Sequence, residues 1–527
     1  MNAATWFSCV EHKVAIAIVW GTLLLLPACQ IPKLSHPYPG PGLPGEFKKA
    51  TGPDAPTALA AVVGGLAIAS PTPESNSTEN SAQLGIEQFY NDPVLTHLIH
   101  QALDSNRELK ILDQEIQIAS NEVLARRGAY LPFVGFNPGA GLDKSSLFSR
   151  NGAVDSGLNI APGQAIPNPL GTYGAGVNVF WQVDIWRQLR NARDAAQRRF
   201  FASLEKRNYF VTRLVAEIAE NYFNLMALDR RFATLDYIIE LQEQSRKVAV
   251  AKKEAARGTE LPVQRFQAEV RKNQSEKLII RQEIIEVENR INFLLNRFPE
   301  PVERSSAGFL DMDIHALDVG VPSQLLANRP DIRQAERELA ATGLDVKVAR
   351  ARFFPTVTLT GGVGYEAFNL RYFFNPEAIA ANVVGNLTAP LINKRAIQAD
   401  YLTANARQLE AAYNYQRVIL NAFTEVVNRV SKAENYRRSL EIKRQQLEAL
   451  DASVDLSTKL LQNASPGVDY LDVLFAQRDL RDAQVIVIDT KKQQLIAIVN
   501  AYQALGGGDL LPPPVIQQPP HVHWWWK

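Results

Sequence analysis

Two pairs of histidines are the first residues in this chain whose spacing suggests chemistry. His97 and His100 would lie one turn apart on a helix, and His521 and His523 stand two residues apart in the C-terminal sequence HVHWWWK. Imidazoles at such spacing can share a metal ion, but a protein metal site normally adds acidic or thiol ligands at matching positions. No full set of such ligands stands beside His97 and His100, so we predict no metal site and no cofactor. We interpret residues 509–527 as a disordered tail, with interfacial contact of its tryptophans as the alternative.

Motifs that mark catalysis are missing from the chain. The sequence contains no G-x-S-x-G, no H-E-x-x-H, no phosphate-binding P-loop and no dinucleotide-binding glycine pattern. Its formal net charge is only +1, which gives no broad basic field to attract a nucleic acid. The sequence therefore predicts neither an enzyme nor a nucleic-acid-binding protein.

The N-terminus has the layout of a secretory signal. Lys13 precedes an apolar run over 14–26, which is too short to span a membrane as a helix and ends at the sequence LPAC. We predict a signal peptide over 1–28 whose lipobox makes Cys29 the site of lipid attachment, with ordinary cleavage and an incidental cysteine as the alternative. Residues 29–81 are dominated by Pro, Gly, Ala, Ser and Asn, so we expect them to form a flexible tether.

The sequence that follows is duplicated. A shift of 223 residues superposes a series of like residues, such as Pro132 on Pro355. With a shift nearer 208, the sequence GTELPVQRFQAEV faces PGVDYLDVLFAQRDL. A series of matches in the same order indicates two related repeats, which we place at 82–300 and 301–508.

Each repeat contains a helix far longer than those of a globular domain. Residues 187–257 lack proline and place apolar side chains near coiled-coil spacing. About 70 residues at about 1.5 Å each give a rod of roughly 100 Å. Gly258 and Pro262 are expected to end it, and the helices 263–298 and 93–127, placed end to end, would run beside it. The second repeat has the same order, with predicted helices over 330–352, 394–463 and 471–502.

Four segments alternate apolar residues with small or polar ones at a period of two, as a strand with two unlike faces does. They cover 133–142, 173–185, 355–365 and 381–391. Each is near the length that crosses a bilayer as a tilted strand, and the Gly-, Ser- and Asn-rich stretch 143–171 suits an external loop. Four strands cannot close a barrel, and lipid does not tolerate an open sheet edge. Two chains would leave little lumen, whereas three would give twelve strands and a water-filled channel.

Four sequence motifs resemble a known family. They are FYNDPVLTHLIHQAL, LLANRPDIRQAERELAATGLDVKVARARFFPTVTL, LTAPLINKRAIQADY and YQALGGG, and they resemble the outer-membrane efflux proteins of the TolC type, in particular the lipoprotein branch that serves resistance-nodulation-division pumps. The resemblance covers about 88–508. It implies a mainly α fold with membrane β: a trimer whose twelve-stranded barrel lies in the outer membrane and whose helical coiled-coil tunnel extends into the periplasm. It also implies a passive duct that joins a periplasmic adaptor and an inner-membrane transporter.

The resemblance further implies a gate and a docking region near the helical breaks. In the family, inward-facing acidic residues close the periplasmic end of the tunnel, and the matching stretch NASPGVDYLDVLFAQ offers Asp469 and Asp472. Three chains would bring these like charges close to one axis, where they would repel anions and attract cations. The alternative is that both are solvated aspartates at a helix start, where negative charge is favourable. Gly258 and Gly467 would form the adaptor-facing tips.

Two other functions share much of this pattern. A type I protein-secretion channel has the same fold, and only its partner transporter would distinguish it from a drug-efflux channel. A lipid-anchored periplasmic coiled-coil rod would need the long helices but not the paired strands.

Overall fold

The computed structural model describes most of the chain between residues 31 and 517. The described residues are 31–44, 81–161, 163–306, 308–312, 314, 320, 322–392, 394–462, 469–508 and 511–517. The predicted signal peptide, the lipid-attachment residue Cys29, the predicted tip residue Gly467 and the HVHWWWK tail lie outside these residues.

The chain divides into two compact units. The first contains the N-terminus up to Tyr38, Ile118–Phe200 and Arg337–Tyr413, and the second contains Pro39–Gln117, Phe201–Glu336 and Asn414–Lys527. We call them the sheet unit and the helical unit. The helices α4 (Arg107–Ala129), α6 (Gln188–Glu254), α9 (Pro330–Ala351) and α10 (Arg395–Gln462) contribute residues to both.

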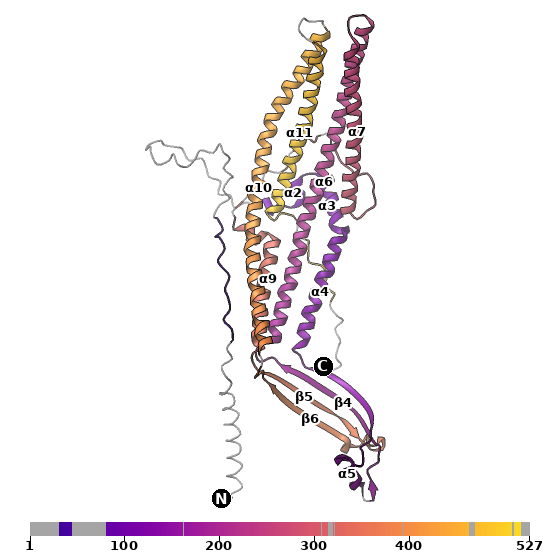
Figure 1. Ribbon diagram of the computed structural model, residues 1–527, viewed down its shortest axis with the longest axis vertical. Coiled ribbons are helices and arrows are strands. Elements are labelled where there is room, and N and C mark those ends of the chain that lie inside the picture. Colours follow the sequence, from indigo (N-terminus) through magenta and orange to yellow (C-terminus); the bar gives the residue numbers. More distant parts are fainter. Residues whose placement is uncertain are drawn as a thin grey trace, which may run out of the picture. The chain divides into compact units, whose positions relative to one another are not determined.

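The sheet unit is built on four long antiparallel strands, which confirms the four strands that the period-two pattern predicts. They are β1 (Phe133–Asp143), β4 (Leu170–Val183), β5 (Thr356–Ala367) and β6 (Ile379–Thr388), in the order β1-β4-β5-β6 (Figure 1). Gly176 pairs with Gly364 across β4 and β5, and a Cβ added to Gly364 would lie 2.4 Å from the Gly176 Cα. Glycine at this position therefore permits a close approach of two backbones.

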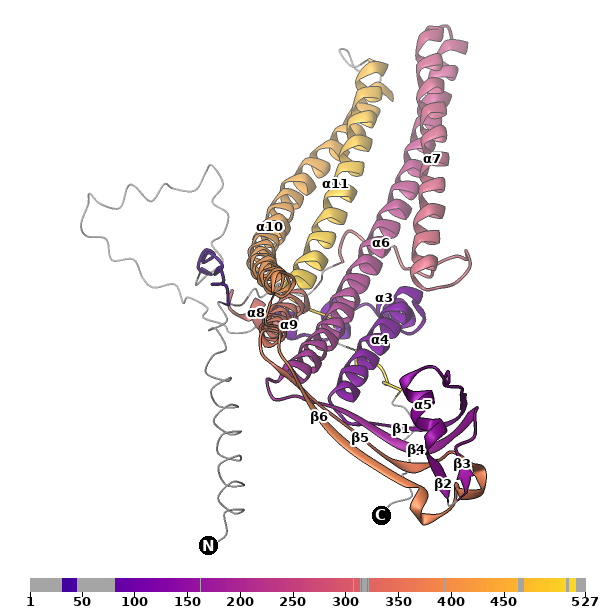
Figure 2. The same cartoon turned by 60° about the horizontal axis from the view of Figure 1, so that its bottom comes forward.

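The stretch 143–171, which we expected to suit an external loop, contains short elements of regular structure. It holds α5 (Arg150–Gly157) and a small hairpin of β2 (Asn159–Ala161) and β3 (Gln164–Ala165), which lie beside the strand ends in Figure 2. Ser149 caps α5, since its side chain accepts a hydrogen bond from the Gly152 N–H. Elements this short have too few residues to show a period in the sequence.

The helical unit contains the predicted hairpins, with one break that the periodicity did not predict. Its other helices are α2 (Ile86–Tyr90), α3 (Pro93–Ser105), α7 (Glu260–Leu294), α8 (Gln324–Asn328) and α11 (Tyr470–Ala504). The helix expected over 93–127 is interrupted at Asn106, whose side chain donates to the carbonyl oxygen of Leu294 at 2.9 Å and accepts from the Leu109 N–H at 3.1 Å. The side chain of Asn106 thus caps the start of α4 and binds the end of α7 at the break.

The first hairpin turns at Ala256 rather than at Pro262. Ala256 has a left-handed backbone (φ 55°), and the N–H groups of Ala256 and Arg257 donate to the carbonyls of Lys253 and Lys252 at 2.9 and 2.8 Å. This is the hydrogen-bond pattern of a Schellman helix end. Pro262 lies in the first turn of α7, where its missing N–H costs no helical bond. The expectation that it ends the long helix was wrong.

The core of the helical unit joins α2, α3, α6, α7 and α11. The rings of Phe89 and Tyr502 stack with centroids 3.8 Å apart, and the Tyr502 hydroxyl donates to the carbonyl of Leu84 at 2.6 Å. The stacked rings and this hydrogen bond fix the end of the return helix α11 against the short helix α2.

Among the described residues, no helix has both the length and the apolar character required to cross a membrane.

Candidate channel sites at the sheet, the strand ends and the helix tips

The four-stranded sheet has one apolar face and one polar face, because the register keeps like residues in rows. Val177 pairs with Phe136 on one side and with Val363 on the other. One residue along β4, Asn178 pairs with Gly362, which in turn pairs with Asn382. A single-residue slip of any strand would exchange the faces, so the pairing is strongly specified.

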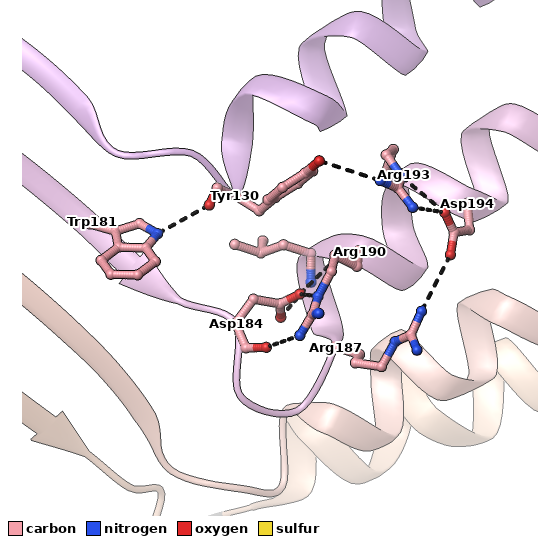
Figure 3. Close-up of polar contacts among 8 residues, drawn as sticks. Tyr130, Trp181, Asp184, Arg187, Arg190, Arg193 and Asp194 are labelled. Atoms are coloured by element: carbon pink, nitrogen blue, oxygen red, sulfur yellow. Dashed lines mark hydrogen bonds and ion pairs between the residues drawn. The ribbon is translucent and has the colours of Figure 1, made fainter.

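Asp184 holds the turn from β4 into α6. Its carboxylate accepts hydrogen bonds from the N–H groups of Leu189 and Arg190, both at 3.0 Å, and from Arg190 Nε at 3.0 Å (Figure 3). The Asp184 side chain is 7% exposed. Burial alone would raise the pKa of this carboxyl, but the two N–H donors and the guanidinium hold the pKa below its usual value. Asp184 thus caps the start of α6 as an N-cap residue would, although it lies before Arg187, whose backbone is left-handed (φ 57°).

A second set of contacts in the sheet unit joins α4, β4 and α6. Trp181 Nε1 donates to the carbonyl of Tyr130 at 3.1 Å, and Arg193 Nη1 donates to the Tyr130 hydroxyl at 3.3 Å. The Arg193 guanidinium also lies 5.6 Å from the centre of the Tyr130 ring. Figure 3 shows Tyr130 lying between Trp181 and Arg193. The main-chain carbonyl and the side chain of one residue, Tyr130, therefore join the ends of the strand and of both helices.

At the other end of the long helices, the structure brings two predicted site residues to one cavity. Gly258, from the α6–α7 turn, and Asp469, from the start of α11, both line a space of about 370 Å³ in the helical unit. Lys252 Nζ donates to the carbonyl of Leu461 near the end of α10 at 3.1 Å. The end of α6 is thus joined to the end of α10 by a cation at the C-terminal end of a helix, where positive charge is electrostatically favoured.

Asp469 and Asp472 form a capping box at the start of α11. Asp469 Oδ1 accepts from the Tyr470 N–H at 2.7 Å, and Asp472 Oδ2 accepts from the Asp469 N–H at 2.8 Å. Both side chains are exposed. This geometry agrees with the interpretation of both residues as aspartates at a helix start. Each carboxylate also keeps acceptor positions that face solvent.

Polar side chains that the sequence analysis did not single out link α11 to the first hairpin. Asn273 is fully buried and donates to Gln242 Oε1 at 2.8 Å, while Arg481 Nη1 donates to Asn273 Oδ1 at 2.9 Å. Gln477, also fully buried, donates to Ser245 Oγ at 2.9 Å. Polar residues at apolar positions of the coiled-coil pattern were the sequence feature that could have predicted them.

Of the histidines singled out in the sequence, His97 and His100 lie on α3. His100 Nε2 lies 3.5 Å from Glu87 Oε1, with both side chains largely exposed. No group of three metal-ligating side chains occurs in the part of the chain that the structure describes. His521 and His523 lie outside that part.

Comparison with known proteins identifies the family. The family model of the outer membrane efflux protein matches residues 98–297 and 321–507, one segment in each repeat. The chain is 25% identical over 434 residues to the cation efflux system protein CusC of Escherichia coli O157:H7, covering 82% of this chain and 90% of that protein. It is 26% identical over 429 residues to the solvent efflux pump outer membrane protein SrpC of Pseudomonas putida, covering 80% and 87%.

The fold comparison agrees. The open state of the MtrE outer membrane channel of Neisseria gonorrhoeae superposes with a TM-score of 0.74 at 22% identity, covering 90% of this chain and 98% of that one. Since the family model covers most of both repeats, the chain belongs to the outer membrane efflux protein family.

Proposed function

We propose that this protein is the outer-membrane channel of a tripartite efflux system and that it works as a homotrimer. The observation that carries the proposal is the two-faced sheet. In the described chain, β1 and β6 are its outer strands and have no partner on their outer sides. Unpaired backbone groups are not tolerated in lipid, so the sheet needs copies of itself to close.

Three copies would join β6 of one chain to β1 of the next and give twelve strands. The apolar rows, such as Phe136–Val177–Val363, would then face lipid, and the row of Asn178, Gly362 and Asn382 would face a water-filled lumen. A barrel of that size leaves space for a solute.

The proposed partners follow from the family. A periplasmic adaptor would dock at the hairpin tips near Gly258 and Gly467, and an inner-membrane transporter would deliver the substrate. Cys29 would carry the lipid that holds the N-terminus at the outer membrane. The relatives are named for cations and for solvents, so we assign small molecules as a class and no single substrate.

The proposal is tested by native mass spectrometry of the detergent-extracted mature protein, followed by conductance in a planar bilayer. We expect a trimer with one lipid adduct per chain and a stable single-channel current. A monomer without conductance would refute the channel, and a trimer of unmodified chains would refute lipid attachment at Cys29 while leaving the channel intact.

A further inference from the structure

A cleft of about 450 Å³ lies in the sheet unit where α6 begins beside the last turns of α9. Each of these segments adjoins a long strand, since β4 ends at Val183 just before the cleft and β5 begins at Thr356 just after it. The charged and aromatic side chains that line it are Trp186, Arg187, Asp194, Lys347, Arg350 and Phe354. The cleft therefore lies where the strands β4 and β5 join the helices α6 and α9.

The cleft has an excess of positive charge. Its one carboxylate, Asp194, is already held by Arg193 Nε at 2.9 Å, and Arg187 Nη2 lies farther away, at 3.9 Å. Lys347 and Arg350 lie one turn apart on α9 and are exposed. Neither makes an ion pair or side-chain hydrogen bond with the residues that the structure describes. Their charges are available to an anion.

One wall of the cleft is aromatic and fixed in position. The Trp186 and Phe354 rings stack with centroids 4.7 Å apart, and Trp186 Nε1 donates to the carbonyl of Pro355 at 2.7 Å. Trp186 is nevertheless 45% exposed. A tryptophan with a bonded N–H and an exposed ring is typical of the boundary between lipid and water.

We propose that this cleft binds the phosphate of a phospholipid headgroup. Lys347 and Arg350 would donate to the phosphate oxygens with Arg187 nearby, and the exposed ring of Trp186 would contact the start of an acyl chain. Lysine and arginine are the side chains that recognise phosphate, and basic pockets between membrane elements bind anionic headgroups. The inference rests on the proposed function, because that function places the strand ends at the membrane surface.

The test uses the detergent-extracted trimer and phosphatidylglycerol with two oleoyl chains as the probe. Native mass spectrometry counts bound lipid as its concentration is raised. We expect the double variant Lys347→Gln/Arg350→Gln to bind about tenfold more weakly, because glutamine replaces two charge-assisted hydrogen bonds with weaker neutral ones. The charge-preserving variant Lys347→Arg/Arg350→Lys should retain binding.

The control is Arg265→Gln/Arg281→Gln, which removes the same charge from two exposed positions on α7 in the helical unit. Its lipid binding should equal that of the unmodified protein. The proposal is overturned if the two glutamine variants bind lipid equally, or if inorganic phosphate at millimolar concentration displaces the lipid completely, which would indicate a simple anion site. Conductance of the same samples keeps the two proposals separate, since a conducting channel without this lipid preference refutes only the cleft.

Discussion

Arg329 Nη1 donates a hydrogen bond of 2.8 Å to the main-chain carbonyl of Ala504, the last residue of α11. The same guanidinium binds the carboxylates of Asp331 and Glu425 at 2.8 and 3.0 Å, and its side chain is only 2% exposed. The last carbonyls of a helix lack partners within it, so a buried cation there satisfies one of them and favours the negative end of the helix dipole.

In the first repeat, a neutral side chain satisfies the carbonyl at the end of the return helix. Asn106, at the position equivalent to Arg329, donates to the carbonyl of Leu294 at the end of α7. The return helix α7 thus ends against Asn106, which directly precedes α4. In the same way, α11 ends against Arg329, which directly precedes α9. The two repeats thus share this contact, and only the second surrounds it with two carboxylates.

Substituting Arg329 should therefore destabilise the protein more than substituting Asn106. Arg329→Met leaves two half-buried carboxylates without their buried cation, and we expect the free energy of unfolding to fall by about 3–5 kcal/mol. Asn106→Ala leaves unsatisfied neutral groups and should lower it by about 1–3 kcal/mol. Thermal unfolding of both variants, with the exposed Arg417→Met as control, makes the comparison. Equal effects of the first two substitutions would contradict the assignment.

The sequence predicted the long helices and strands because their patterns extend over many residues. The alternation in Thr356–Ala367 and the proline-free Gln188–Glu254 each repeat a simple rule. Asn106 could not be predicted as a break, since its effect depends on a carbonyl 188 positions away. The buried Asn273–Gln242 pair is equally nonlocal, because its partner lies on another helix.

The candidate sites divide in the same way. The capping box of Asp469 and Asp472 could be inferred from two aspartates three residues apart after a break, because both partners are local. The cleft between Trp186 and Lys347 brings the two repeats together, so no local pattern indicates it. Trp186 and the two cations on α9 come from segments about 160 positions apart, which meet only because the start of α6 lies beside the end of α9.

Asp184 should make the stability of the sheet unit depend on pH. Its folded-state pKa lies below the usual value, so it contributes stability above its unfolded pKa of about 3.9. That contribution is lost as the pH falls through the lowered folded pKa. Asp184→Asn should therefore destabilise the protein at pH 7, and the difference from the unmodified protein should shrink towards pH 2.

Thermal unfolding at pH 7, 4 and 2.5 measures this dependence. The control is Asp400→Asn, since Asp400 has an exposed side chain paired with Arg352 and should show a small difference at every pH. A difference for Asp184→Asn that stays constant from pH 7 to 2.5 would show that the lost interaction does not depend on the carboxylate charge.

The C-terminal segment 511–517, beyond the family match, contacts α4 and α6 within the helical unit. Gln117 Nε2 donates to the carbonyl of Gln517 at 3.2 Å, and the Gln517 N–H donates to Gln117 Oε1 at 2.9 Å. Arg207 Nη1 donates to the carbonyl of Pro512 at 3.3 Å. Reciprocal bonds from one glutamine side chain hold the segment as a neighbouring strand would.

Two truncations separate this segment from the tail that follows it. Removing residues 511–527 should lower the melting temperature by several degrees, since about 1–3 kcal/mol of hydrogen bonding and packing is lost. Removing only residues 518–527 keeps these contacts and should leave the melting temperature unchanged. If removing residues 518–527 alone causes most of the fall in melting temperature, the contacts of residues 511–517 do not stabilise the protein.

The capping box complicates any test of Asp469 and Asp472 as a gate, because an alanine would remove a helix cap and a charge together. Asparagine retains an oxygen that can accept the N–H bonds, so Asp469→Asn/Asp472→Asn removes the charge with little effect on the cap. If three copies of these carboxylates ring the channel axis, the asparagine variant should show a raised conductance and a reduced preference for cations over anions. The variant Asp469→Ser/Asp472→Gln restores the capping box with other neutral residues and should behave in the same way. Unchanged conductance and cation preference in both variants would leave the aspartates as helix caps alone, and the narrowest part of the duct would have to be sought elsewhere along α10 and α11.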